Sequence, residues 1–220
     1  MVKGVIFDMD GLMFDTERLS TIFWRQTGEE FGVDVPEEFT YCFRGRNPAA
    51  IREAFLERYG ADFDYERFRE IRTRLQYDYI REKGVPLKKG LIELLEYLQK
   101  KGIRAAVATS TDRKLADTMI ERAGVRGYFD AFAYGDMVER SKPHPDVFLR
   151  AAKELGILVE ECLVLEDSIA GVEAGKAAGG YIIHIPDLIV VPEEVKEGIT
   201  AQYDSLDEVI GWLEGGGSHV

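Results

Sequence analysis

The sequence predicts an α/β protein with a doubly wound, Rossmann-like parallel sheet and an inserted α-helical cap. Short apolar runs rich in β-branched residues alternate with stretches of helical periodicity. One long helical stretch, from about Asp15 to Lys83, interrupts this alternation directly after the first run. Because parallel neighbours need crossover connections, the alternation implies helices on both faces of the sheet.

Five apolar runs predict buried strands. The first contains Val2, Val5, Ile6 and Phe7 and ends before Asp8. Such a short apolar run is typical of a strand that is buried on both faces of a sheet. The other four cover residues 104–108, 131–134, 162–165 and 181–185. Each is separated from the next by a helical pattern, so the strands are expected to be parallel.

Apolar stripes predict the helices between these runs. Leu91, Leu94, Leu95 and Leu98 follow the i, i+3, i+4, i+7 spacing, and Gly102 closes that helix. Similar stripes contain Leu115 with Met119, and Val147, Phe148, Ala151 and Leu155 ahead of Gly156. Ser168 is a candidate N-cap for the next helix, which Gly179 is expected to end.

The segment that breaks the alternation keeps helical spacing throughout, for example at Phe23, Phe55 and Phe68. We therefore predict a Rossmann-like catalytic core made of residues 1–14 and 87–220, and a helical cap at residues 15–86. Two interpretations of the cap remain open. It is either a lid over a site at the strand ends or a stabilising appendage.

The charge of the chain restricts its partners. A formal net charge of −12 argues against nucleic acid, since a polyanion binder needs a face rich in lysine and arginine. A small ligand is expected instead, and an anionic one must be held by local positive groups.

No window approaches the roughly 18 apolar residues of a membrane span, and the start lacks a signal-like apolar segment. We expect a cytoplasmic protein without a membrane partner, with a monomer as the default.

Polar residues follow the predicted strands. Asp8 and Asp10 come after the first, Thr109 and Ser110 after the second, Lys142 after the third, and Glu166 with Asp167 after the fourth. In doubly wound sheets, ligands bind at the carboxyl ends of the strands, so these side chains are expected to converge. Carboxylates so closely gathered do not all remain ionised unless a cation neutralises them.

Oxygen ligands suit Mg²⁺, which uses one or two carboxylates and takes further ligands from water and phosphate. A carboxylate that attacks a phosphate meets like charge, which costs roughly 4 kcal/mol at 4 Å and an effective dielectric near 20. Magnesium and Lys142 would remove that cost. The Thr109 hydroxyl and the Ser110 amide, at the expected start of the next helix, are candidate phosphate donors.

Four segments contain the polar residues that follow the predicted strands. They are Phe7-Asp8-Met9-Asp10-Gly11, Ala108-Thr109-Ser110, Ser141-Lys142-Pro143-His144-Pro145 and Leu165-Glu166-Asp167-Ser168-Ile169-Ala170-Gly171. These segments resemble the four motifs of the haloacid dehalogenase superfamily, in order and suitably spaced. The resemblance is greatest to its β-phosphoglucomutase-like branch, which carries a helical cap after the first strand, and it spans almost the whole chain.

The resemblance implies a role for each motif residue. Asp8 would attack phosphorus and form an aspartyl phosphate, while Asp10 would protonate the leaving oxygen and then activate water. Lys142 and Thr109 would bind the transferring group. The implied magnesium ligands are Asp8, the main-chain carbonyl of Asp10, Asp167 and, directly or through water, Glu166.

Structural alternatives exist for each residue taken singly. Asp10 could form a turn, Lys142 could be a surface lysine, and the Glu166-Asp167 pair could favour a helix start. A non-enzymatic module that senses a phosphorylated metabolite is the corresponding alternative for the whole chain. His184 alternates with apolar neighbours and is expected to be a core histidine rather than a ligand.

Departures from the family motifs distinguish between chemistries. The superfamily's dehalogenases lack the second aspartate, so Asp10 favours phosphoryl transfer. The mutase cap has a histidine where this sequence has Ser20, and an arginine where it has Pro48. We therefore predict a magnesium-dependent phosphatase for a small phosphorylated metabolite, a sugar phosphate or similar, with a β-phosphoglucomutase-type sugar phosphomutase as the alternative. Arg44 and Arg46 of the cap loop, with Ser20, are candidates for substrate binding, and a solvated loop is equally compatible with the two arginines.

Overall fold

The computed structural model describes residues 2–41, 43, 48–188 and 192–216 of the chain. The chain divides into two compact units, a sheet unit of Met1–Asp15 with Val85–Val220 and a helical unit of Thr16–Gly84. The roles assigned to them from the sequence, catalytic core and cap, remain predictions.

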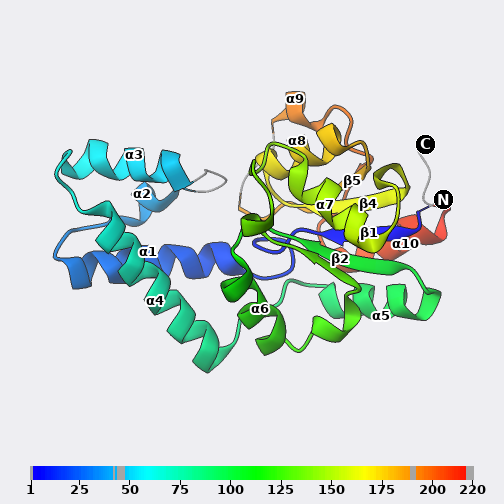
Figure 1. Ribbon diagram of the computed structural model, residues 1–220, viewed down its shortest axis with the longest axis horizontal. Helices are drawn as coiled ribbons and strands as arrows, with labels where there is room; N and C mark the ends of the chain where they lie inside the picture. The colour runs from blue at the N-terminus through cyan, green and yellow to red at the C-terminus, as the bar shows by residue number, and fades with distance from the viewer. Residues whose placement is uncertain (1, 42, 44–47, 189–191, 217–220) are drawn as a thin grey trace. The chain divides into compact units, whose positions relative to one another are not determined.

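The sheet unit contains a six-stranded parallel sheet in the order β3-β2-β1-β4-β5-β6 (Figure 1). The chain thus winds outward from β1 in both directions, so the doubly wound fold predicted from the sequence is confirmed. The strands are β1 (Gly4–Phe7), β2 (Arg104–Ala108), β3 (Ala131–Ala133), β4 (Cys162–Glu166), β5 (Tyr181–His184) and β6 (Ala201–Gln202).

The first strand is central because it pairs with two neighbours along its whole length. Val5 lies opposite Ala105 of β2 on one side and Leu163 of β4 on the other. All four residues of β1 are buried, as its unbroken apolar sequence predicts. This position places the residue after Phe7 between the ends of β2 and β4.

Helices cover both faces of this sheet. Figure 1 shows α7 and α8 on one side of the strands and α5 on the other. The α-helices of the unit are α5 (Leu91–Lys101), α6 (Arg113–Arg122), α7 (Asp146–Leu155), α8 (Ile169–Ala178), α9 (Glu193–Lys196) and α10 (Val209–Glu214). Short 3-10 turns occur at Arg126–Tyr128, Gly135–Met137, Val159–Glu161 and Leu206–Glu208.

The predicted helix ends are confirmed where the sequence supplies a specific cap. Gly102 and Gly156 end α5 and α7 in the left-handed conformation, with φ of 68° and 64°. The Ser168 hydroxyl oxygen accepts a hydrogen bond of 3.0 Å from the Gly171 amide and caps α8.

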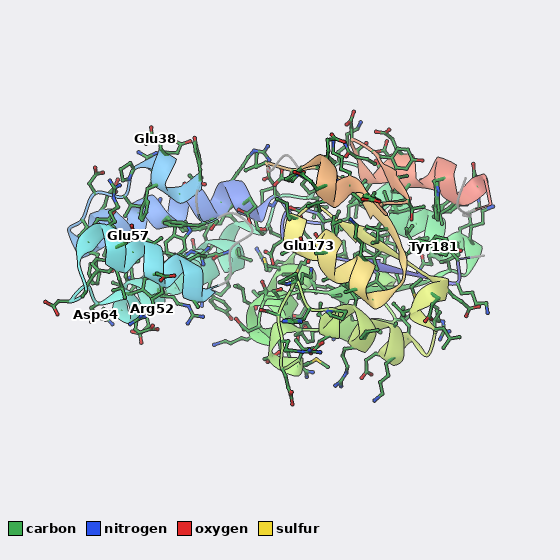
Figure 2. All side chains as sticks on the ribbon, turned by 90° about the horizontal axis from the view of Figure 1, so that it is seen from above. Glu38, Arg52, Glu57, Asp64, Glu173 and Tyr181 are labelled. Atoms are coloured by element: carbon green, nitrogen blue, oxygen red, sulfur yellow. The ribbon has the colours of Figure 1, made fainter. Side chains whose placement is uncertain are left out.

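The helical unit consists of α1 (Thr16–Phe31), α2 (Glu37–Tyr41), α3 (Pro48–Tyr59) and α4 (Tyr65–Lys83). Its centre is aromatic. The Phe55 ring lies 4.8 Å from Phe68 and 5.3 Å from Trp24, measured between centroids, and all three side chains are buried. Charged residues such as Glu38, Arg52, Glu57 and Asp64 are exposed (Figure 2). The unit therefore has a hydrophobic core of its own.

Candidate active site

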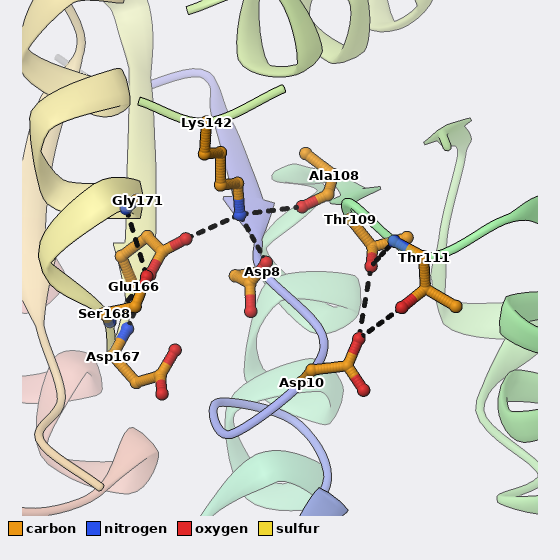
Figure 3. Close-up of polar contacts among 10 residues, drawn as sticks. All are labelled: Asp8, Asp10, Ala108, Thr109, Thr111, Lys142, Glu166, Asp167, Ser168 and Gly171. Carbon is orange, nitrogen blue, oxygen red and sulfur yellow. Dashed lines mark hydrogen bonds and ion pairs between the residues drawn. The ribbon is translucent and has the colours of Figure 1, made fainter. Parts of the chain in front are cut away.

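Asp8 is the residue that directly follows β1, and it is held between neighbouring strands. Its amide donates a 3.0 Å hydrogen bond to the main-chain oxygen of Leu165 in β4. The Lys142 amino group donates to Asp8 Oδ1 and, at 2.6 Å, to Glu166 Oε1 (Figure 3). It also lies 3.5 Å from the main-chain oxygen of Ala108 at the end of β2. Three side chains, with a main-chain oxygen from a fourth segment, thus meet at the carboxyl ends of the strands.

Glu166 is fully buried, and both of its carboxylate oxygens accept hydrogen bonds. While Oε1 accepts from Lys142, Oε2 accepts from the amides of Asp167 and Ser168 at 2.9 Å each. The Ser168 hydroxyl adds a third bond to Oε2 at 3.0 Å. Gly171 makes room for this carboxylate, because a Cβ there would lie 1.8 Å from Glu166 Cδ. Glu166 therefore joins Lys142 to the beginning of α8.

The side chains of Asp8, Glu166 and Asp167 form a buried acidic cluster. One carboxylate oxygen from each lies within 4.8 Å of the others. Asp167 reaches this position because Gly11, with φ of 85°, has no side chain, and a Cβ there would lie 2.2 Å from Asp167 Oδ2. Three oxygen donors at this spacing fit a hard divalent cation such as Mg²⁺. This cluster could therefore hold the predicted metal.

The electrostatics of the site favour such a cation. Burial raises the pKa of Asp8 to about 8; repulsion from Glu166 and Asp10 acts in the same direction, while Lys142 opposes it. Burial lowers the pKa of Lys142, but attraction to Asp8 and Glu166 outweighs that effect and raises it. The ammonium group is thus firmly charged. A single ammonium does not offset three buried carboxylates, so a divalent cation would help to keep Asp8 ionised.

Asp10 does not turn towards this cluster but towards the loop after β2 (Figure 3). Its Oδ2 accepts a hydrogen bond of 2.7 Å from the Thr111 hydroxyl and a longer one of 3.4 Å from the Thr109 hydroxyl. The Thr111 amide in turn donates to Thr109 Oγ1 at 3.0 Å. Sequence reasoning gave Thr111 no role. The signal was present, because Thr111 is a hydroxyl residue in the same strand-end run as Thr109.

The expectation that the Ser110 amide lies at the beginning of the next helix is wrong. Helix α6 begins at Arg113, and its N-cap is Asp112, whose carboxylate accepts from the Leu115 amide at 3.2 Å. Asp112 has the side chain that satisfies a free helix amide, so the helix begins after it. The Ser110 amide therefore lacks the helix-end character on which its predicted phosphate binding depended. A role for it as a loop amide stays a prediction.

The cap candidates lie in the helical unit or outside the described residues. Ser20, on α1, accepts a 2.7 Å hydrogen bond from the Arg72 guanidinium, which lies 4.5 Å from the Trp24 ring centroid. Arg44 and Arg46 fall outside the described residues. A role for these three in substrate binding stays a prediction.

His184 is buried in β5, as expected of a core histidine. Its Nε2 lies 3.1 Å from the main-chain oxygen of Asp167. A carbonyl oxygen can only accept, so the contact places a proton on Nε2. The histidine therefore helps to fix the main chain of an acidic residue of the cluster.

Comparison with known proteins decides the family. Residues 2–179 match the family model described as haloacid dehalogenase-like hydrolase. This chain is a haloacid dehalogenase-like hydrolase.

Relatives of the hydrolase include phosphatases. It is 32% identical over 182 residues to the phosphorylated carbohydrates phosphatase of Thermotoga maritima, covering 81% of this chain and 82% of that protein. It is 31% identical over 177 residues to the fructose-1-phosphate phosphatase of Escherichia coli K12, covering 80% and 92%. The family match and these relatives confirm the predicted enzyme class, phosphoric monoester hydrolase.

A solved structure places the hydrolase in its branch. A Thermotoga maritima protein assigned as a β-phosphoglucomutase superposes with a TM-score of 0.81 at 29% identity, covering 97% of this chain and 99% of that one. The predicted β-phosphoglucomutase-like branch is thereby confirmed.

Among the helices that the structure describes, none combines the length and apolar character needed to cross a bilayer.

Proposed function

We propose that this hydrolase removes the phosphoryl group from a small phosphorylated carbohydrate and that Asp8 is the nucleophile. The observation that carries the proposal is the position of Asp8, buried after the central strand beside Lys142 and two further carboxylates. The carbohydrate substrate is supported by the names of two relatives, which act on phosphorylated carbohydrates and fructose 1-phosphate.

In the proposed reaction an Asp8 oxygen attacks phosphorus while the bond from phosphorus to the ester oxygen breaks. Asp10 gives its proton to the departing oxygen, so that an alcohol leaves and an aspartyl phosphate remains. Water then attacks phosphorus, Asp10 takes a proton from it, and Asp8 is released with inorganic phosphate. Lys142 and Thr109 bind the phosphoryl oxygens. Magnesium, when bound, would neutralise part of the negative charge of the carboxylates and of the phosphate.

A sugar phosphomutase is the second candidate, favoured by the likeness to the protein assigned as a β-phosphoglucomutase. Ser20 argues against it, since the family resemblance places a histidine there in mutases. Incubation with hexose phosphates separates the two functions. We expect inorganic phosphate to accumulate, whereas accumulation of an isomeric sugar phosphate with little free phosphate would identify a mutase.

Hydrolysis of 4-nitrophenyl phosphate with Mg²⁺ by wild type and Asp8→Asn tests the proposed nucleophile. The amide keeps the shape of the side chain but cannot attack phosphorus, so we expect kcat to fall by at least about 10³-fold. Asp62→Asn is the matched control because Asp62 is exposed in the helical unit. Equal turnover by wild type and Asp8→Asn would exclude Asp8 as the nucleophile, whereas no turnover by wild type would favour the non-enzymatic module that senses a phosphorylated metabolite.

A further inference from the structure

The two threonines after β2 make unequal hydrogen bonds to Asp10. The Thr111 hydroxyl lies 2.7 Å from Asp10 Oδ2, a normal length for an O–H···O bond, whereas the Thr109 hydroxyl lies 3.4 Å away. A hydroxyl has a single proton to donate. Thr111 therefore commits its proton to Asp10, while the Thr109 proton is only weakly engaged.

The loop that carries Thr111 is fixed against the end of β3. The Thr109 amide donates to the Ala133 main-chain oxygen at 3.0 Å, and the Gly135 amide donates to the Thr111 main-chain oxygen at 3.0 Å. Gly135 also permits close approach of the two backbones, because a Cβ there would lie 2.1 Å from the Ser110 carbonyl oxygen. The Thr111 hydroxyl is therefore aimed at Asp10 before any substrate binds.

We propose, on the basis of the function proposed above, that Thr111 is a positioning residue that decides which oxygen of Asp10 exchanges the proton. Thr111 donates to Oδ2, and the carbonyl oxygen of a carboxylic acid accepts hydrogen bonds better than its hydroxyl oxygen does, so this bond favours the acid form with its proton on Oδ1. In phosphoryl transfer this proton passes from Oδ1 to the departing ester oxygen as the phosphorus–oxygen bond breaks, and Asp10 is left as the carboxylate. The Thr111 bond to Oδ2 persists in both forms, and Thr109 remains available to a phosphoryl oxygen.

Thr111→Val tests this assignment because valine keeps the shape of threonine and removes the donor. The value of kcat/KM reports the phosphoryl-transfer step, which needs an acid only when the leaving group is poor. For phenyl phosphate we expect a fall of about tenfold or more, a part of the 10²–10⁴ that general acids contribute. For 2,4-dinitrophenyl phosphate, whose phenolate departs unprotonated, we expect a change of less than about twofold.

Four further variants make the comparison specific. Thr111→Ser restores the hydroxyl and should lie within about twofold of wild type for both esters. Thr118→Val makes the same hydroxyl-to-methyl change on α6, where Thr118 bonds only the Lys114 main-chain oxygen among the contacts described, and should not alter the ratio between esters. Gly135→Ala forces the Ser110 carbonyl to move and should reproduce the selective loss. Thr111→Ala serves the same comparison if the valine variant does not fold.

The results separate this inference from the function on which it rests. If wild type hydrolyses neither ester, the proposed function fails. If wild type is active but Thr111→Val is unchanged, or loses equal factors on both esters, Thr111 does not position the acid, while the proposed function stands. The assignment would also be overturned if Thr111→Ser did not restore the wild-type ratio of kcat/KM for phenyl phosphate to kcat/KM for 2,4-dinitrophenyl phosphate.

Discussion

At the scale of single residues, the site depends on a balance between one buried ammonium and several buried carboxylates. Lys142 contacts Asp8 and Glu166, and each of these side chains is at most about a tenth exposed. Attraction inside the protein offsets the cost of burying charge only while all partners are present.

Removal of the ammonium by Lys142→Met should leave the carboxylates without their partner. We expect a loss of about 3–5 kcal/mol in the free energy of unfolding, because breaking a buried ion pair leaves uncompensated charge. Phosphatase activity should fall by at least about 10²-fold. Urea unfolding and steady-state kinetics measure the two effects. Lys153→Met, at an exposed position of α7, is the matched control, and a Lys142 variant as stable and active as that control would contradict the account.

Magnesium affinity should depend on pH because metal and proton compete for Asp8. Burial first, with Glu166 and Asp10 adding to it, raises the pKa of Asp8 to about 8 in the metal-free protein. The acid form therefore predominates below that pH, and the dissociation constant for Mg²⁺ should increase about tenfold for each pH unit below about 8. Calorimetric titration at several pH values, in buffers of different ionisation enthalpy, measures both the affinity and the released proton. An affinity that stays constant between pH 6 and 8 would contradict the raised pKa.

At the scale of elements, the beginning of α8 is shaped around Glu166. The Ser168 side chain caps the helix and also donates to Glu166, and Gly171 leaves space for the carboxylate. A helix end, a carboxylate and a lysine from another segment are thereby joined into one network. A change within the helix should therefore affect the site.

Gly171→Ala should be destabilising although alanine is the better helix former. The new Cβ would overlap Glu166, and overpacking of this kind costs about 1–3 kcal/mol, which opposes a gain of up to about 1 kcal/mol in helix propensity. Gly211→Ala in α10 is the matched control, because a Cβ added there would meet nothing within 4 Å, and it should be neutral or stabilising. Thermal unfolding compares the two variants. Equal stability would show that Glu166 moves aside at no cost.

At the scale of the whole molecule, the chain consists of two units, each with its own core. Phe55→Ala should lower the stability of the helical unit by about 3–5 kcal/mol, because a fully buried aromatic side chain is removed. Fluorescence reports this unit specifically in a Trp212→Phe background, where Trp24 is the remaining tryptophan. Ile22→Ala removes a side chain that is 47% exposed and should cost less than about 1 kcal/mol. A Phe55 variant as stable as the Ile22 variant would contradict an aromatic core.

Much of the fold follows from the sequence because its local signals agree. The unbroken apolar run of β1, the leucine stripe of α5 and the glycines that end α5 and α7 each predict the structure that forms. The two-residue strand β6 escaped prediction, since Ala201 and Gln202 form no apolar run and their pairing to β5 depends on tertiary contacts. Ile22 keeps helical spacing with Leu19 and Phe23 but is partly exposed, because periodicity does not define the edges of a buried face.

Prediction of the site was limited by side-chain direction. The carboxyl ends of the strands bring Asp8, Lys142, Glu166 and Asp167 together. The position of these residues after predicted parallel strands was sufficient to expect this. The direction of the Asp10 carboxylate depends instead on Thr111, and the position of Thr111 depends on Gly135 in another loop. Such relations appear only when the segments are placed in space.

The central claim is that Asp8 receives the phosphoryl group, and direct mapping of the acid-quenched enzyme tests it. Enzyme mixed with substrate and Mg²⁺ is quenched in acid during turnover, digested and analysed by mass spectrometry. We expect an acyl phosphate on the peptide that contains Asp8, absent from Asp8→Asn and lost when all the substrate has been consumed before the quench. A phosphoryl group on another residue, or undiminished turnover by Asp8→Asn, would contradict the account.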